Sequence, residues 1–174
     1  AHPEAVIELT YQYRMCDDVA ALSNFLIYSN KLKCGNEQVA RKKINLPRLK
    51  ELKNFHCPQE LHEKDWLCEI LEPHKKVIFL NYDLCEEEQL IEINEQKTIT
   101  NPGEVDIAEQ CVNGLIHAGM DCRDIGVMTL YRAQLQLLNT RFASDHYSNL
   151  EILTADQFQG CLLYTSDAAD DGES

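Results

Sequence analysis

The sequence predicts an α/β fold in which helices flank a parallel sheet. Short apolar runs at residues 76–82, 125–129 and 150–154 have the length and composition of buried strands. Amphipathic helical patterns at residues 101–119 and 132–142 separate these runs. Because strands that alternate with helices pair in parallel through right-handed crossovers, we expect a parallel sheet.

The first elements in chain order are a helix and a strand. The helix begins at Asp17 or Asp18, either of which can cap it, ends near Tyr28, and has apolar side chains along one face: Val19, Leu22 and Leu26. Residues 30–75 have no periodicity that predicts an element. The strand covers residues 76–82, and its continuous apolar run is typical of a strand that is buried on both faces: Val77, Ile78, Phe79 and Leu80.

The helix after residue 100 has the strongest local signals. Asn101 stands at the N-cap, Pro102 at the first helical position, and Glu104 where its carboxylate can reach back to the cap amide. Gly119 provides a C-terminal stop. The apolar stripe of this helix consists of Val105, Ala108, Cys111, Val112, Leu115 and Ile116.

Two strands and the helix between them complete the pattern. We expect the helix to carry Leu135, Leu138 and Phe142 inward, and the strands end at Thr129 and Thr154. Ligands of parallel sheets bind at the carboxyl ends of the strands, where a hydroxyl and nearby amides can contact a phosphate. Threonine also ends strands that bind nothing, so the residues alone leave this role open.

Composition describes a globular chain that is acidic overall, with a net charge of −13. Its basic residues concentrate between Lys31 and Lys53, which hold eight of the sixteen, in a segment that faces either a nucleic acid, a protein partner or solvent. Acid concentrates from Asp83 to Glu95, where we expect a solvated loop. There is no signal peptide pattern and no run long enough to cross a bilayer, so we expect no membrane partner.

The eight cysteines include no C-x-x-C pair, which predicts free thiols in a reducing compartment and no metal site. The last residues differ from the rest of the chain. The run from Cys161 to Asp170 resembles the translation of a transposase-type sequencing-library adapter. We therefore expect the domain to cover residues 1–160 and the tail at 161–174 to be non-native.

Ordered motifs carry a resemblance to a known family. Residues 9–15, Leu-Thr-Tyr-Gln-Tyr-Arg-Met, and residues 154–160, Thr-Ala-Asp-Gln-Phe-Gln-Gly, resemble two signatures of superfamily-one helicases in the branch of the nonsense-decay RNA helicase. Between them, Asn101 with Glu104 and the run at 124–134 match in order. The resemblance implies a RecA-like, P-loop NTPase-type second helicase domain that is C-terminally truncated, with a basic insert at about 30–75 and an acidic loop at about 83–100.

A narrower resemblance is to the nuclease-helicases of eukaryotic DNA replication. It rests on Lys31-Leu32-x-Cys34-Gly35, on residues 44–46, and on Trp66-Leu67 ahead of Glu72-Pro73. It implies an ATP-dependent DNA helicase with nuclease activity in replication and repair, located in the nucleus and also in mitochondria. It further implies ATP and Mg²⁺ shared with a first RecA-like domain, an iron-sulfur cluster elsewhere in the parent, and single-stranded DNA and a single-strand-binding protein as partners.

The resemblance also assigns site residues. It implies that Arg14 is an arginine finger, catalytic toward the γ-phosphate, and that Gln12 and Tyr13 bind the nucleotide with it. Gln159 and Gly160, after Asp156, join the nucleotide site to the DNA groove. The residues implied to contact single-stranded DNA are Thr129, Arg132 and Thr154.

This sequence departs from the family pattern at Leu130, which replaces a proline, and at Ala155, which replaces a valine. No G-x-x-x-x-G-K-[ST] loop occurs, so we expect the chain alone to be inactive. Two alternatives stay open: an RNA or RNA–DNA helicase of the same branch, and a non-enzymatic RecA-like interaction module.

Overall fold

The structure is a computed structural model that describes residues 7–54, 66–81, 93–95 and 98–158. The chain divides into two compact units. Unit 1 comprises residues 1–45 and 72–79, and unit 2 comprises residues 46–71 and 80–174. Each unit is described by itself.

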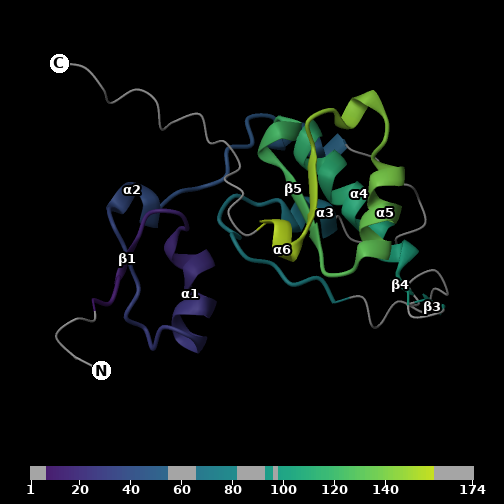
Figure 1. The fold of residues 1–174 in the computed structure, drawn as a ribbon. Coiled ribbons are helices and arrows are strands. Elements are labelled where there is room, and N and C mark those ends of the chain that lie inside the picture. Colours follow the sequence, from purple (N-terminus) through teal and green to yellow (C-terminus); the bar gives the residue numbers. More distant parts are fainter. Residues whose placement is uncertain (1–6, 55–65, 82–92, 96–97, 159–174) are drawn as a thin grey trace, which may run out of the picture. The chain divides into compact units, whose positions relative to one another are not determined.

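Unit 1 is built around a short parallel pair of strands. Strand β1 (Tyr11–Gln12) pairs with β2 (Lys33–Cys34). Helix α1 (Asp17–Leu26) and the short helix α2 (Glu37–Ala40) lie beside them (Figure 1). The chain leaves α1 through two left-handed residues, Ser29 and Asn30, with φ of 50° and 60°.

Helix α1 differs from its predicted form at both ends. Its N-cap is Cys16, which makes no side-chain capping bond, and Asp17 and Asp18 lie in the first turn. Carboxylates in the first turn favour a helix through its dipole without capping it, so the charge pattern alone misplaced the cap by one residue. The helix ends at Leu26 rather than at Tyr28. Its predicted apolar face is largely exposed: Val19, Leu22 and Leu26.

Unit 2 holds most of the regular structure. In chain order its elements are the 3-10 helix η2 (Leu49–Asn54), α3 (Trp66–Ile70), β3 (Ile93–Glu95), β4 (Thr98–Thr100), α4 (Pro102–His117), η4 (Cys122–Asp124), β5 (Gly126–Thr129), α5 (Arg132–Arg141), η5 (Asp145–Tyr147), β6 (Glu151–Thr154) and α6 (Ala155–Phe158).

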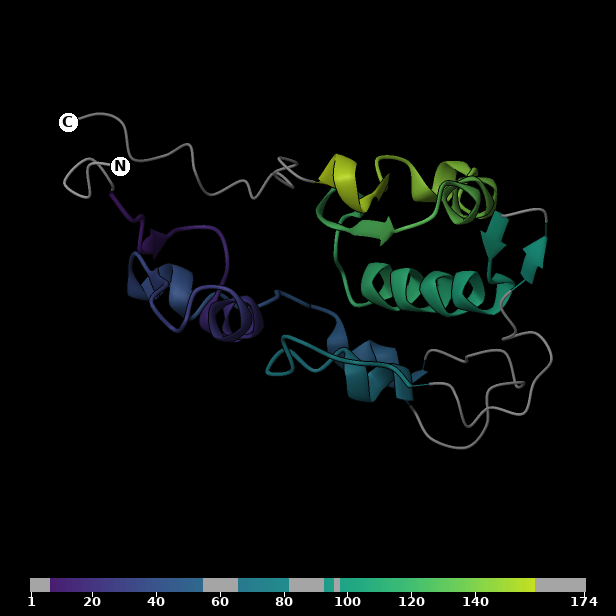
Figure 2. The same ribbon diagram turned by 60° about the horizontal axis from the view of Figure 1, so that its bottom comes forward.

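The centre of unit 2 is the parallel pair β5 and β6, in the register Gly126 to Glu151 through Thr129 to Thr154. Both strands, their parallel pairing and the helix between them were predicted and are confirmed. Helices α4 and α5 lie beside β5 (Figures 1 and 2). The core between them consists of Val105, Val112, Ile125, Leu138 and Phe142.

Helix α4 forms as its local signals predict. The Glu104 amide donates to Asn101 Oδ1 at 3.1 Å, and Pro102 occupies the first turn. At the other end Gly119 has a φ of 100°, its amide donates to Ile116 O, and the Met120 amide donates to Leu115 O. These two hydrogen bonds form a Schellman motif, which is why the helix stops at the predicted glycine.

The predicted strand at 76–82 is wrong over residues 76–81, which form no strand, and Tyr82 lies outside the described residues. Val77, Ile78 and Phe79 are exposed, and Phe79 is 88% exposed. A continuous apolar run specifies a strand only when a partner strand supplies hydrogen bonds, and no described strand pairs with this segment. Lys76 instead forms an ion pair with Asp18 of α1 at 2.7 Å.

The expectation of an acidic loop at about 83–100 is wrong in its second half. Residues 93–95 and 98–100 form an antiparallel pair, β3 and β4, while 83–92 and 96–97 lie outside the described residues. The first half of that expectation and the expected tail at 161–174 lie outside them as well.

The segment from Lys31 to Lys53 has an anchor on α4. The Arg48 amide donates to Ala118 O at 2.8 Å, and its guanidinium donates to Ile116 O at 3.1 Å. Pro47 packs so closely on Gly119 that a Cβ there would lie 2.8 Å from the proline ring. This contact fixes the end of the basic segment against the C-terminus of α4, where a cation also complements the helix dipole.

Candidate nucleotide and DNA site

The Gln12 side chain shapes the loop that carries Arg14. Gln12 Oε1 accepts from the amides of Arg14 and Met15, both at 2.8 Å, and Gln12 Nε2 donates to Met15 O at 2.6 Å. The side-chain amide of Gln12 therefore binds the loop backbone both as a donor and as an acceptor. Gln12 thus holds the backbone of this loop, while its contact with a nucleotide stays a prediction.

One further contact reaches this loop from β2, and two others tie α1 to the chain that enters β2. Gln12 Nε2 also donates to Cys34 Sγ at 2.9 Å. A hydrogen bond with the Asp17 carboxylate, followed by burial, raises the pKa of the Cys34 thiol, so the neutral thiol is the form that lies here. Asn24 exchanges hydrogen bonds of 2.9 Å with both backbone groups of Leu32, which ties α1 to the chain entering β2.

Tyr13 and Arg14 are both exposed on this braced loop. The ring of Tyr13 covers Gly35, where an added Cβ would lie 2.0 Å from Tyr13 Cε1. Only a residue without a side chain leaves room for the ring in this place. An exposed guanidinium and an exposed aromatic ring on adjacent residues suit a phosphate and a base or ribose.

Thr129 and Thr154 end neighbouring parallel strands and are direct register partners. The Thr129 hydroxyl accepts from the Tyr131 amide at 3.4 Å, and the Thr154 hydroxyl donates to Gln157 Oε1 at 3.1 Å. The predicted meeting of the two threonines at one sheet edge is thus confirmed. Their contact with DNA is not tested by this geometry and stays a prediction.

The remaining predicted residues lie around this edge or outside the described chain. Arg132 is exposed in the first turn of α5, and Asp156 is exposed in α6. Gln157, to which we assigned no role, accepts from both the amide and the hydroxyl of Thr154. Gln159 and Gly160 lie outside the described residues.

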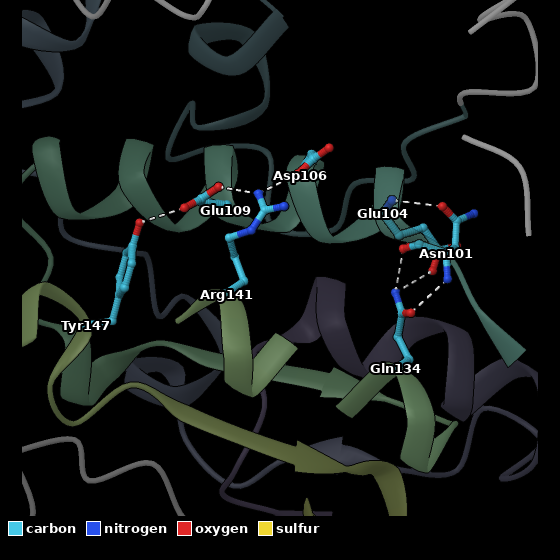
Figure 3. A network of polar contacts seen from close by, with 7 residues as sticks. All are labelled: Asn101, Glu104, Asp106, Glu109, Gln134, Arg141 and Tyr147. Atoms are coloured by element: carbon cyan, nitrogen blue, oxygen red, sulfur yellow. Dashed lines mark hydrogen bonds and ion pairs between the residues drawn. The ribbon is translucent and has the colours of Figure 1, made fainter. Parts of the chain in front are cut away.

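A polar network joins α4 to α5 and η5 (Figure 3). Gln134 is 5% exposed, and its side chain accepts from the Asn101 amide at 2.8 Å and donates to Asn101 O at 2.9 Å. The sequence predicted Glu104 for that amide and missed this partner. Spacing indicates only that Gln134 is buried, because it precedes the buried Leu138 and Phe142 by four and eight positions on one helical face.

Further along the same helices, Arg141 reaches between two carboxylates of α4 (Figure 3). Its guanidinium lies 2.5 Å from Asp106 and 2.7 Å from Glu109, and the bond to Glu109 is the main cause that raises the Arg141 pKa. The Tyr147 hydroxyl adds bonds of 3.1 Å to Glu109 and Asn113. This part of the network serves the packing of helices rather than a ligand.

The predicted site residues therefore fall into two groups, one in each unit. Gln12, Tyr13 and Arg14 lie together in unit 1, and Thr129, Arg132 and Thr154 lie together in unit 2. Within the described ranges, no group of His, Cys, Asp and Glu is placed to hold a metal ion, and the cysteines there form no disulfide. No helix of those ranges is both long and apolar enough to cross a membrane.

Comparisons with known proteins agree with these motifs. The family model described as AAA domain matches residues 1–161. The chain is 55% identical over 159 residues to the DNA replication ATP-dependent helicase/nuclease DNA2 of Saccharomyces cerevisiae, covering 91% of this chain and 10% of that protein.

Relatives from a plant and an animal have similar names. The chain is 34% identical to the DNA replication ATP-dependent helicase/nuclease JHS1 of Arabidopsis thaliana, over 94% of this chain and 11% of that protein. It is 35% identical to DNA2 of Xenopus laevis, over 90% of this chain and 15% of that protein. The chain thus spans only about a tenth to a seventh of these curated relatives. The expected RecA-like α/β class is confirmed, and the chain belongs to the AAA domain family.

Proposed function

We propose that the chain is part of an ATP-dependent DNA helicase and nuclease of DNA replication, to which it supplies an arginine finger and part of a single-stranded DNA groove. The names of the relatives support the activity, and they match over nine tenths of this chain. The observation that carries the proposal is the Gln12 side chain, which fixes the backbone of the loop bearing Arg14.

The chemistry of phosphoryl transfer explains why such a loop is needed. Negative charge develops on the γ-phosphoryl oxygens during hydrolysis, and a guanidinium stabilises it through paired N–H donors that keep their charge at any working pH. Electrostatic stabilisation is effective when the donor is already in place. By bonding both backbone faces of the loop, Gln12 keeps Arg14 in place before the nucleotide arrives.

This chain supplies half of a binding site for ATP and its metal ion. The braced loop offers a guanidinium and the Tyr13 ring to ATP, and bound Mg²⁺ would neutralise phosphate charge from the side of a first RecA-like domain in the parent. The family resemblance also assigns nucleotide binding to Gln159 and Gly160, which lie outside the described residues. We place the iron-sulfur cluster and the nuclease elsewhere in the parent.

The DNA groove in this proposal runs along the ends of β5 and β6. Thr129 and Thr154 offer hydroxyls and backbone amides from adjacent strands, and Arg132 adds a charge. Contacts of this kind bind the sugar–phosphate backbone without reading sequence, as a translocating motor requires. We expect the parent to act in replication and repair, in the nucleus and in mitochondria, together with a single-strand-binding protein.

The substitution Arg14→Ala in the full-length parent tests the proposal. We expect the kcat of DNA-stimulated ATP hydrolysis to fall about a thousandfold, while the Kd of a non-hydrolysable ATP analogue changes by less than about threefold. Arg14→Lys keeps the charge but lacks the forked geometry, so its kcat is also low. Steady-state kinetics and equilibrium titration measure the two quantities.

Arg41→Ala is the matched control, because Arg41 is an exposed arginine of the same unit that pairs with Glu37 one helical turn away. Its kcat should equal that of the wild type. If Arg14→Ala abolishes analogue binding while the bound fraction turns over normally, Arg14 has a structural role and the proposal is wrong.

A further inference from the structure

Gln134 is a buried side chain whose hydrogen bonds connect elements distant in sequence. It is 5% exposed in the first turn of α5, and it bonds both backbone groups of Asn101, thirty-three residues earlier. Asn101 is the N-cap of α4 and follows β4 directly. Gln134 therefore joins α5 to the start of α4 (Figure 3). Its side chain binds the amide and the carbonyl of Asn101, as the backbone of a neighbouring strand would.

The first turn of α5 is continuous with the proposed groove. Thr129 ends β5, its hydroxyl accepts from the Tyr131 amide, and Tyr131 is the N-cap of α5. Arg132 follows at the first helical position, and Gln134 lies two residues further on. A shift of this turn also displaces Thr129, because only Leu130 and Tyr131 lie between β5 and α5.

We propose that Gln134 is a positioning residue for the single-stranded DNA groove: its bonds to Asn101 hold the first turn of α5 so that Thr129 and Arg132 face successive phosphates. The proposal rests on the groove of the proposed function. Gln134 is buried and touches no DNA itself. Loss of these bonds weakens DNA binding more than it changes the KM for ATP.

Two substitutions in the full-length parent separate positioning from folding. Gln134→Leu keeps the approximate size and removes both bonds to Asn101. We expect its Kd for a fluorescent oligothymidylate to rise about tenfold, while the KM for ATP at saturating DNA stays within about twofold. Gln136→Leu is the matched control, because Gln136 is an exposed glutamine on the same helix.

Gln134→Glu adds a pH readout that a general loss of stability does not imitate. An ionised carboxylate accepts from the Asn101 amide but cannot donate to Asn101 O, and it faces Glu104, whose Oε2 lies 3.4 Å from Gln134 Nε2. The acids Asp106 and Glu109 of α4 face Arg141 instead. Burial and Glu104 both favour protonation, and the protonated carboxyl regains the donor.

We therefore expect the DNA affinity of Gln134→Glu to be low at about pH 8 and to approach that of the wild type at about pH 6. The wild type and Gln136→Glu, titrated over the same range, provide the baseline. Thermal melting at each pH confirms that every variant is folded at the temperature of the assay.

The outcomes distinguish this inference from the proposed function. If Thr129→Val and Arg132→Ala lose affinity while Gln134→Leu binds as the wild type does, the positioning role is wrong and the groove stands. If Thr129→Val and Arg132→Ala also keep full affinity, the groove is wrong and the inference falls with it. Should Gln134→Leu fail to fold, a Gln134→Glu affinity that does not depend on pH beyond the baseline overturns the inference.

Discussion

At the scale of single residues, glutamine side chains do the positioning in both units. Gln12 holds the loop of Arg14, Gln134 holds the start of α5, and Gln157 binds Thr154. A primary amide offers donors and an acceptor in one plane, so it can bind two backbone groups at once. It carries no charge, so these three contacts do not titrate and are little affected by salt.

Gly35 provides a test of the nucleotide loop. Gly35→Ala places a methyl group where the Tyr13 ring lies, and the exposed ring must move off the β2 backbone. If Tyr13 contacts the base or ribose, we expect the KM for ATP of the full-length parent to rise about fivefold with little change in kcat. Steady-state ATPase kinetics at saturating DNA measure both constants.

Gly126→Ala serves as the control for this substitution, since Gly126 is an exposed glycine of β5 in the other unit. It should leave the KM unchanged. An unchanged KM for Gly35→Ala, in a protein that melts at the wild-type temperature, would show that Tyr13 takes no part in nucleotide binding.

Tyr147 makes the free energy of unfolding of the chain decrease as the pH rises into the alkaline range. Burial is the main cause that raises its pKa, and its hydroxyl donates to Glu109 and lies 3.1 Å from the Asn113 side-chain amide. The folded state thus holds this proton more tightly than the unfolded state does. The resulting stabilisation is complete below the unfolded pKa of about 10 and is lost as the pH rises through the folded pKa.

We expect Tyr147→Phe to lower the free energy of unfolding of the chain by about 1 kcal/mol at neutral pH and to flatten its decline above about pH 10. Urea unfolding across the pH range measures both effects. The exposed Tyr131 gives the comparison, because Tyr131→Phe should retain the neutral-pH stability and the alkaline decline. The same decline in Tyr147→Phe as in the wild type would assign it to another group.

At the scale of elements, the pairing of α4 with α5 organises unit 2. The two helices share an apolar core and are also joined by a polar network (Figure 3). Arg141 is the charged centre of this network, since it bonds two carboxylates that lie three residues apart on α4, Asp106 and Glu109.

Arg141→Met tests how much this ion pair network contributes. The side chain of Arg141 is 37% exposed, so solvent screens its interactions, and we expect the free energy of unfolding to fall by about 1 kcal/mol. Added salt should reduce the difference from the wild type. Arg123→Met removes an ion pair of 3.1 Å with Asp121 that joins no two helices, and it should cost less. Equal losses in both variants would contradict the role of the network.

The sequence predicts elements well where their determinants are local. The caps of α4 are such determinants, because the hydrogen bonds at Asn101 and Gly119 join residues that are only a few positions apart. The same holds for Thr129 and Thr154, which the strand ends place side by side. Residues 76–81 were predicted wrongly because the pairing that makes a strand depends on a distant segment.

Local patterns also miss polar contacts between elements. The role of Gln134 could not be predicted, because the partner is a backbone group far away in sequence and any residue type can supply it. Gln12 was assigned through family resemblance rather than from its neighbours. Its contact with Cys34 depends on β2 folding back beside β1, which no short motif specifies.

At the scale of the whole molecule, charge is divided between the two units. Unit 1 contains eight Lys and Arg residues against six Asp and Glu, although the chain as a whole has a net charge of −13. Unit 2 therefore holds the acidic excess together with Thr129 and Thr154. We expect phosphate affinity in that unit to come from placed hydroxyls and amides and from Arg132 more than from its overall charge.

The purified 174-residue chain should hydrolyse no ATP, with or without single-stranded DNA. Arginine-finger catalysis requires a phosphate-cradling loop, and this sequence contains no G-x-x-x-x-G-K-[ST] motif to form one. A coupled phosphate-release assay, run beside the chain carrying Arg14→Ala to measure background, gives the rate. Hydrolysis that DNA stimulates and Arg14→Ala abolishes would show that the chain is a complete motor.

The anchor of Arg48 on α4 also bears on the order of folding. Its guanidinium bond to Ile116 O joins residues 68 positions apart and therefore closes a long loop, whereas the hydrogen bonds of α4 join residues one helical turn apart. During synthesis Arg48 leaves the ribosome well before Ile116 and has no partner until α4 has ended at Gly119. A contact between residues so far apart in sequence forms after the local contacts. We therefore expect it to be a late step in the assembly of unit 2.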